Sequence, residues 1–263
     1  MPEPLIVTLG DALALALISP QQAMLPASSS PADTVVTVGG QAAIAACWAA
    51  TTGARARCLS ARSYDRLGDL LEAELADRGV ELQGPGVEGR TGLAAVVRVA
   101  GARRTALTDR GVCAQLEAEA LQPDWISDAD VLHVSGYAML DQPSAGAAER
   151  AVELARDAGA LVSIDLACAD IVSPLVRQRL LALRADVAFA TPAQAEAIGG
   201  ADDLASLPVV SDAAAGAADP MGVADAYAAG YLAATAAGAE PDDADELGRE
   251  MAGRCGATDG PVP

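Results

Sequence analysis

Short apolar runs and helix-like stretches alternate along this chain. The apolar runs have the length and composition of buried strands and cover residues 5–9, 34–38, 57–60, 131–134, 161–165, 187–190 and 207–210. The helix-like stretches lie between and after them, at residues 41–52, 68–78, 145–158, 172–183, 194–198, 224–237 and 244–253. The alternation predicts an α/β fold in which a mostly parallel central sheet is covered by helices on both faces.

Two segments, residues 11–38 and 91–108, interrupt this alternation because they are strand-like and contain no helical pattern. In the first, a Pro- and Ser-rich stretch at 19–32 indicates a loop. In the second, Ala100-Gly101-Ala102 separates two strand-like runs and predicts a hairpin. We expect one domain over residues 1–263, with the two segments forming a small β-lid over the carboxyl edge of the sheet, where ligands of such folds bind.

Composition and charge narrow the classes of partner. The 263 residues carry a net charge of −19, which argues against nucleic acid and anionic membrane surfaces. No residue is Lys, so a Schiff-base or P-loop lysine is excluded. The five Cys and the single His lack metal-ligand spacing, so we expect no metal-binding residues. No leader-like start or membrane-length apolar run is visible, and we expect a cytoplasmic protein with no membrane partner.

The stretch 219–232, DPMGVADAYAAGYL, carries the most distinctive chemistry. Gly222, Val223 and Ala224 precede a helix of small residues, and the free backbone N–H groups of its first turn would form an anion site. Asp225 lies in that turn, where a carboxylate could act as a general base beside the anion. The alternative is that Asp225 only caps a buried helix.

This stretch resembles the C-terminal signature of the ribokinase (PfkB) family of carbohydrate kinases, D-T-x-G-A-G-D-x-F-x-x-G. Asp219, Gly222, Asp225 and Gly230 match it, whereas Val223 and Ala224 stand in place of Ala and Gly. Other segments resemble the family in the same order along residues 5–257, among them Gly39-Gly40, Asp65-x-x-Gly68, Arg90-Thr91-Gly92, Arg110-Gly111 and residues 132–140. The resemblance implies a ribokinase-like fold and a kinase that uses ATP and Mg²⁺. It also implies that Asp225 deprotonates the sugar hydroxyl and that residues 222–224 hold the transferred phosphate.

The same resemblance gives the candidate substrate-binding residues, which are Asp11, Leu15, Gly39, Gly40, Ile44, Arg110, Tyr137, Asp165 and Leu166. Three of them depart from the family, because Leu15 replaces an Asp, Ile44 replaces an Asn, and Asp165-Leu166-Ala167 replaces Asp-Pro-Asn. Apolar side chains cannot pair the hydroxyl groups of a buried sugar. We therefore expect Leu15, Ile44 and Leu166 to converge on a hydrophobic small-molecule ligand.

The residues that serve ATP and Mg²⁺ in the family are also altered. Thr191-Pro192-Ala193-Gln194 stands where the family has the Asn-x-x-Glu that organises Mg²⁺ and phosphate. Residues 195–218 are too few for the family's nucleotide-holding segment, and no Gly-x-x-Gly turn is visible there. A carboxylate-to-amide change removes charge that a hard cation needs. The sequence therefore predicts weak or absent Mg-ATP binding, with no cofactor expected unless the family activity is retained.

Three functions stay open at this point. The first is a repurposed enzyme in which Asp225 performs acid/base chemistry, such as cyclisation, dehydration or proton transfer, on a hydrophobic metabolite. The second is an active ATP-dependent sugar kinase with Asp225 as its base, and the third is a non-catalytic binding or regulatory protein. Because an exposed lid has unpaired edges and an apolar face, and because relatives often pair through their lids, we expect a homodimer.

Overall fold

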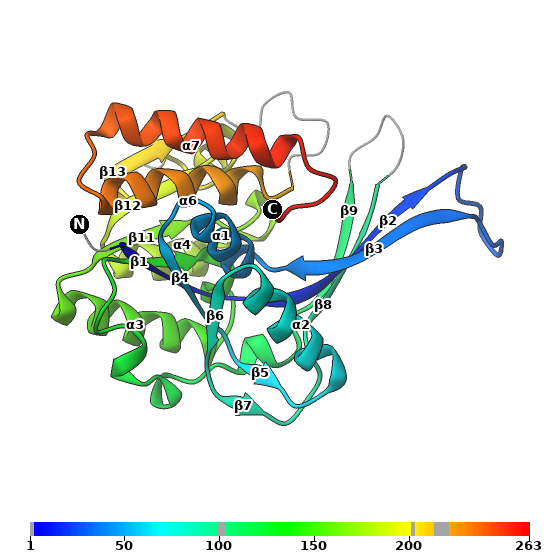
Figure 1. The fold of residues 1–263 in the computed structure, drawn as a ribbon, viewed down its shortest axis with the longest axis horizontal. Helices are drawn as coiled ribbons and strands as arrows, with labels where there is room; N and C mark the ends of the chain where they lie inside the picture. Colours follow the sequence, from blue (N-terminus) through cyan, green and yellow to red (C-terminus); the bar gives the residue numbers. More distant parts are fainter. Residues whose placement is uncertain (1–2, 99–103, 201–202, 213–220) are drawn as a thin grey trace.

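Seven parallel strands form the central sheet of the computed structural model, which describes residues 3–98, 104–200, 203–212 and 221–263 (Figure 1). Their order across the sheet is β13 (Ala205–Val210), β12 (Ala185–Ala190), β11 (Leu161–Asp165), β10 (Val131–Ser135), β1 (Leu5–Leu9), β4 (Arg55–Leu59) and β6 (Val80–Gln83). All six pairings are parallel. The α/β class with a mostly parallel sheet, expected from the sequence, is confirmed.

Helices cover both faces of this sheet. Successive side chains of each strand point to opposite faces, so the apolar strands carry side chains that must be buried on both. In β1, Leu5, Val7 and Leu9 belong to the core on one face, and Ile6 belongs to the core on the other. The first core includes side chains of α3 (Ser144–Ala158) and α4 (Pro174–Leu183), and the second includes those of α1 (Gln41–Ala50), α6 (Val223–Ala236) and α7 (Pro241–Gly256). Small residues in α1 and α6 allow these buried helices to approach closely.

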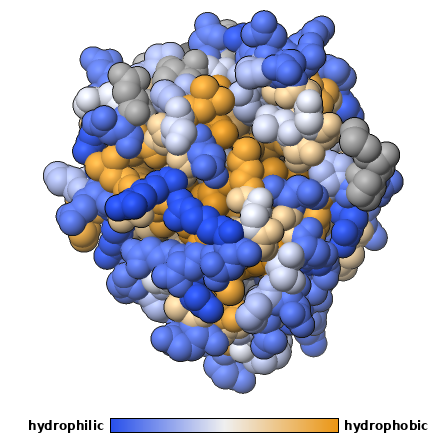
Figure 2. Space-filling model, turned by 90° about the vertical axis from the view of Figure 1, so that its left-hand side faces the viewer, coloured by the Kyte–Doolittle hydropathy of each residue, from blue (hydrophilic) through white to orange (hydrophobic). Residues whose placement is uncertain are grey.

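A second sheet of four strands projects from the carboxyl side of the main sheet as a lid (Figure 1). Its order is β3 (Ala32–Gly39), β2 (Leu13–Pro20), β8 (Leu93–Val97) and β9 (Thr105–Asp109). These four strands come from the two segments that the sequence predicts to be strand-like, residues 11–38 and 91–108. The hairpin turn expected at 100–102 lies outside the described residues. The end of the molecule away from the lid mixes hydrophilic and hydrophobic side chains (Figure 2).

The remaining elements complete the layers around β4 and the lid. Helix α2 (Arg66–Asp77) lies against β6 and β3, and the two-residue strands β5 (Arg62–Ser63) and β7 (Gly86–Val87) pair with each other. Helix α4 begins at Pro174 because the Ser173 side chain accepts a hydrogen bond from the backbone of Val176. No helix in the described part of the chain combines the length and the apolar character that a bilayer crossing requires.

Candidate active site

The first turn of α6 has the geometry expected of an anion site. Its N-cap residue, Gly222, has a left-handed backbone with φ of 80°. A Cβ atom at Gly222 would lie 2.5 Å from the carbonyl oxygen of Pro261, so only glycine fits. Trp48 fixes the C-terminal segment in turn, since its Nε1 donates to the same Pro261 oxygen at 2.8 Å. Val223 and Ala224 follow Gly222 and present the free N–H groups of a helix start.

Asp225 lies in this first turn and is not the cap, because Gly222 holds that position and no described side chain caps the helix. Its side chain is buried, and its Oδ1 has no hydrogen-bond partner among the described residues. Burial raises the pKa of Asp225 to about 7, and the charge of Arg104, from the lid, limits that rise. A carboxyl group with a pKa near 7 is suited to exchange protons with a substrate at neutral pH.

Asp165 is a second buried carboxylate close to Asp225. It ends β11, in register with Ser135 on β10 and Phe189 on β12. Burial raises its pKa well above the ordinary value, and the negative charge of Asp225 raises it further, while a hydrogen bond from Gln41 opposes the rise. Its Oδ2 has no hydrogen-bond partner within the described part of the chain. Two carboxylates in one buried site cannot both ionise readily, so the charge of one favours the protonated form of the other.

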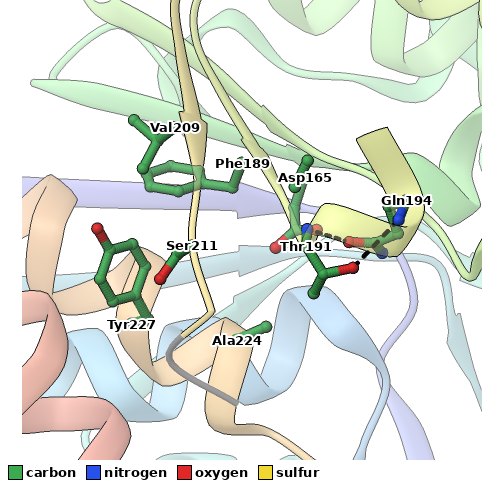
Figure 3. A pocket seen from close by; sticks show the side chains of 9 residues that line it. Asp165, Phe189, Thr191, Gln194, Val209, Ser211, Ala224 and Tyr227 are labelled. Atoms are coloured by element: carbon green, nitrogen blue, oxygen red, sulfur yellow. Dashed lines mark hydrogen bonds between the residues drawn. The ribbon is translucent and has the colours of Figure 1, made fainter. Parts of the chain in front are cut away.

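A pocket lined by Asp165 opens at the carboxyl ends of β11, β12 and β13 and reaches Ala224, the residue before Asp225 (Figure 3). Its lining side chains come from three strands and from the starts of α5 (Pro192–Ala197) and α6, namely Asp165, Phe189, Ala190, Thr191, Gln194, Val209, Ser211, Ala224 and Tyr227. Figure 3 shows Asp165 pointing from its strand toward the first turn of α6. The pocket thus places a buried carboxylate opposite a helix start, with aromatic side chains at its far side.

Gln194, which replaces the metal-organising acid of the family, has its whole amide group engaged. Its Oε1 accepts from the backbone N–H of Thr191 at 2.7 Å, which completes a capping box on α5. Its Nε2 donates to the carbonyl oxygens of Leu166 at 2.9 Å and Ala167 at 3.0 Å. Because two backbone acceptors require an N–H donor, the amide is suited to this position and a carboxylate is not. Gln194 therefore joins α5 to the end of β11.

Asp11 and Arg110 form a separate group where the lid meets the main sheet. The Arg110 guanidinium donates from Nε and Nη2 to the two Asp11 carboxylate oxygens, at 2.8 and 2.9 Å. Both side chains are largely buried. Gly40 makes the adjacent turn, with φ of 89° and no room for a Cβ against the Asp11 carbonyl oxygen, and Gly39 ends β3 beside it. These predicted site residues lie together, but neither Asp11 nor Arg110 lines the pocket beside Asp165.

The expected convergence of Leu15, Ile44 and Leu166 is wrong. The three side chains belong to three different hydrophobic cores: Leu15 to the lid, Ile44 to the face covered by α1, and Leu166 to the face covered by α3. Each is 3% exposed or less. Apolar side chains at these positions turn into existing cores, so they offer no wall to a ligand. These three residues therefore give no support to a hydrophobic ligand.

Some side chains of the site were missed by the sequence analysis. Gln41, the first residue of α1, hydrogen-bonds Asp165 and accepts from the Ser135 hydroxyl at 2.6 Å. Tyr137, which was expected in the site, lies near both carboxylates, and burial raises its pKa to about 12. A polar residue that opens an otherwise apolar helix directly after Gly39-Gly40 is the signal that could have identified Gln41.

Comparison with protein-family models matches residues 3–216 to the pfkB family carbohydrate kinase model. The chain belongs to the PfkB family. No curated protein matches it closely enough to count as a relative. For this PfkB protein, the matched region includes the lid, Asp165 and Gln194, but ends before Gly222.

Solved structures with the same fold come from several kinases. The PfkB protein is similar to the adenosine kinase from Sinorhizobium meliloti, with a TM-score of 0.84 and 21% identity over 98% of this chain and 95% of that one. It is similar to the fructokinase with bound ATP from Xylella fastidiosa, with a TM-score of 0.78 and 22% identity over 98% and 92%. For the ribokinase from Thermotoga maritima the values are 0.75, 18%, 99% and 96%. Identities this low establish the ribokinase-like fold alone.

Proposed function

We propose that this PfkB protein is a phosphotransferase that acts on a hydroxyl group of a small carbohydrate-like molecule, with Asp225 as the general base. The observation that carries the proposal is the position of Asp225, a buried carboxyl group in the first turn of α6 directly after the left-handed Gly222. Family membership supports the reaction class. Fold alone would not, because one fold can support several chemistries.

Each part of the site has a task in this proposal. Asp225 accepts the proton of the acceptor hydroxyl, and a pKa of about 7 keeps a useful fraction of the base ionised at neutral pH. The backbone N–H groups of Val223 and Ala224 bind the transferred phosphoryl group, since the start of a helix favours anions. Asp165 favours the protonated state of Asp225 after transfer, because the two like charges repel.

The family also implies ATP and Mg²⁺, and the residues fit this requirement unevenly. Gln194, at the position of the metal-organising acid, is fully used by three backbone groups and does not fit the role. Among the residues that the structure describes, the buried side-chain oxygens without partners lie instead on Asp165 and Asp225. When bound, Mg²⁺ neutralises charge on the phosphates and holds them in line. We expect weak ATP binding, with a dissociation constant of roughly 1 mM, about 4 kcal/mol weaker than a micromolar one.

A second function is favoured by one observation. The amide of Gln194 is hydrogen-bonded to the backbone, so it does not serve a metal or a nucleotide. If the nucleotide site is lost, Asp225 and Asp165 remain a proton-exchanging pair beside an anion-binding turn. Such a pair could perform cyclisation, dehydration or proton transfer without ATP. The ligand would again be a small molecule, and a hydrophobic one is now supported only by Phe189, Val209 and Tyr227 in the pocket.

The two functions are separated by product analysis. Purified protein is incubated with Mg-ATP and a panel of sugars and nucleosides, and the products are identified by mass spectrometry. The proposal predicts a phosphorylated product and equimolar ADP, both lost in Asp225→Asn. Micromolar ATP affinity in a parallel titration would refute the expected weak binding. A panel without any phosphorylated product, together with conversion of a metabolite in the absence of ATP, would favour the second function.

A further inference from the structure

We propose that Trp48 is a positioning residue for the phosphate-binding turn at the start of α6, and that it acts through the segment of residues 257–262 after α7, here called the C-terminal strap. Trp48 lies in α1 and contacts Pro261 of the strap, 213 positions away in the sequence. The effect on the backbone of the turn is measurable without substrate, whereas the effect on turnover rests on the proposed function.

The strap lies directly against the turn. A Cβ atom at Gly222 would lie 2.5 Å from the oxygen of Pro261, 2.8 Å from its Cα and 2.9 Å from its Cβ. Three atoms of one residue therefore support the left-handed turn without a gap. The carbonyl oxygen of Gly222 in turn accepts from the Ala226 N–H at 2.8 Å, the bond that begins the helix. The position of Pro261 thus influences how the first turn presents its free N–H groups.

The indole of Trp48 holds Pro261 in this position. Trp48 is 1% exposed, and its Nε1 donates to the Pro261 oxygen across a buried distance of 2.8 Å. The sulfur of Cys255 also lies 3.8 Å from this oxygen, but a thiol is a weak donor. Without the indole N–H the buried carbonyl would keep only that weak donor, which is costly. Trp48 is therefore the principal hydrogen-bond donor to Pro261.

The strap is also joined to the lid and to the core. After β8, the Arg98 side chain donates from Nη1 to the carbonyl oxygen of Asp259 at 3.1 Å. A Cβ atom at Gly260 would lie 3.7 Å from Leu17 Cδ1 of β2, so the strap is in contact with the lid. Val262, on the other side of Pro261, belongs to the core that includes α1 and α6. The strap thereby connects the lid to the turn, and Trp48 holds the residue between them.

This arrangement has a specific consequence for phosphoryl transfer. Backbone N–H groups stabilise a transferring phosphoryl group only where they are already aimed at the charge that develops on it. A small displacement of such donors slows the chemical step while the acceptor still binds. We therefore expect a loss of the Trp48 hydrogen bond to lower kcat and to leave the KM of the acceptor nearly unchanged.

The first test is amide hydrogen exchange in the full chain without ligand, followed by NMR. We expect Trp48→Phe to accelerate exchange of the Ala226 amide about fivefold or more. Leu232, in the middle of the same helix, is the internal control and should change much less. Trp125→Phe is the matched control, because Trp125 is the only other Trp and packs against the core on the opposite face of the sheet. It should leave Ala226 as in wild type.

A second form of the protein removes the N–H group and keeps the shape of the side chain. In the Trp125→Phe chain, Trp48 is replaced by 3-benzothienylalanine, in which sulfur stands in place of the indole N–H. This form should show the same faster exchange at Ala226. With the acceptor found in the sugar panel, Trp48→Phe should lower kcat about tenfold, with the KM of the acceptor nearly unchanged.

Several results would overturn the inference. Wild-type exchange at Ala226 in both altered forms is one, and equal acceleration at Ala226 and Leu232 is another, because it would make Trp48 a general core residue. Loss of cooperative melting in both forms, or an unchanged kcat despite faster exchange, would also contradict it. Faster exchange at Ala226 without any phosphorylated product supports the positioning of the turn and rejects the phosphotransferase, and phosphorylation with unchanged exchange does the reverse.

Discussion

Asp165, at the end of β11, and Asp225, in the first turn of α6, are buried carboxylates close enough that the charge of Asp225 raises the pKa of Asp165. Neither residue is near the other in sequence, and they meet because the carboxyl end of a central strand faces the start of a buried helix. Protonation of one of the two carboxyl groups relieves the repulsion between the charges. The chemistry proposed for this chain depends on that pair.

The pair makes folding stability fall as pH rises. Burial raises the pKa of Asp225 from 3.8 to about 7. Between about pH 4 and pH 7 the folded chain therefore keeps a proton that the unfolded chain has lost, and each step toward higher pH weakens the folded state. Asp225→Asn removes this titration, so we predict that it raises the free energy of unfolding by roughly 2–4 kcal/mol at pH 8 and by much less at pH 5.

Urea unfolding of wild type and Asp225→Asn at both pH values, without added metal, measures this difference. Asp170→Asn is the matched control, because it removes an exposed charge and should show no such pH dependence. Equal stability differences at pH 5 and pH 8 would show that Asp225 is ionised throughout and would contradict the buried, mutually repelling pair.

Gln194→Glu should not restore a family-like metal site. The new carboxylate would face the Leu166 and Ala167 carbonyl oxygens, which would lose their donor and repel it. We predict destabilisation of about 1–3 kcal/mol, the range for unpaired buried polar groups, and no gain in Mn²⁺ affinity. Thermal unfolding measures the stability, and a titration with Mn²⁺ followed by the EPR signal of the free ion measures the metal affinity. A variant with unchanged stability and tighter Mn²⁺ binding would show that this amide is a lost metal ligand.

The Asp11–Arg110 ion pair should be important for the stability of the lid attachment. Arg110→Ala leaves the buried Asp11 carboxylate without its two hydrogen bonds, and removal of one partner of such a pair typically costs 3–5 kcal/mol, so we predict a loss of about that size. The double variant with Asp11→Asn should recover part of the loss in urea unfolding. If Arg110→Ala alone costs less than about 1 kcal/mol, the pair is solvated and does not hold the lid.

We predict that two copies of this chain form a homodimer through their lids. On its outer face the strand registers place Val36, Ala16, Ala95 and Leu107 in one row across all four strands. Val36 is 59% exposed and Leu107 67% exposed, which leaves an apolar row for a second copy to cover. Light scattering at micromolar concentration should give a dimer mass, and Val36→Asp with Leu107→Asp should give a folded monomer. A wild-type monomer mass would contradict the prediction.

Most of the fold could be predicted because its strands are short apolar runs separated by recognisable helices. The strand β1 is buried on both faces, and the sequence shows this directly as an apolar run that only Thr8 interrupts. The edge strand β6 was missed because Glu81 and Gln83 interrupt its apolar character and only Val80 is buried. Edge strands need little burial, so their sequence pattern is weak.

The site was less accessible to prediction than the fold. Asp225 could be found because its turn is local in sequence, whereas the partnership of Gln41 with Asp165 depends on how α1 approaches β11. Leu15 was misassigned for a related reason. A substitution that removes a polar contact was taken to leave an apolar wall, but the side chain had a lid core available to it, and burial there is favourable.

The most direct test of the central claim is the effect of Asp225→Asn on turnover of the acceptor found in the sugar panel. If Asp225 is the base, kcat should fall by about 100-fold or more, with KM nearly unchanged, and the wild-type rise of kcat with pH near 7 should disappear. Asp170→Asn should behave as wild type. An Asp225→Asn variant that keeps wild-type kcat and the same pH profile would contradict the account. The reaction would then proceed at full rate without the carboxylate that is proposed to accept the proton.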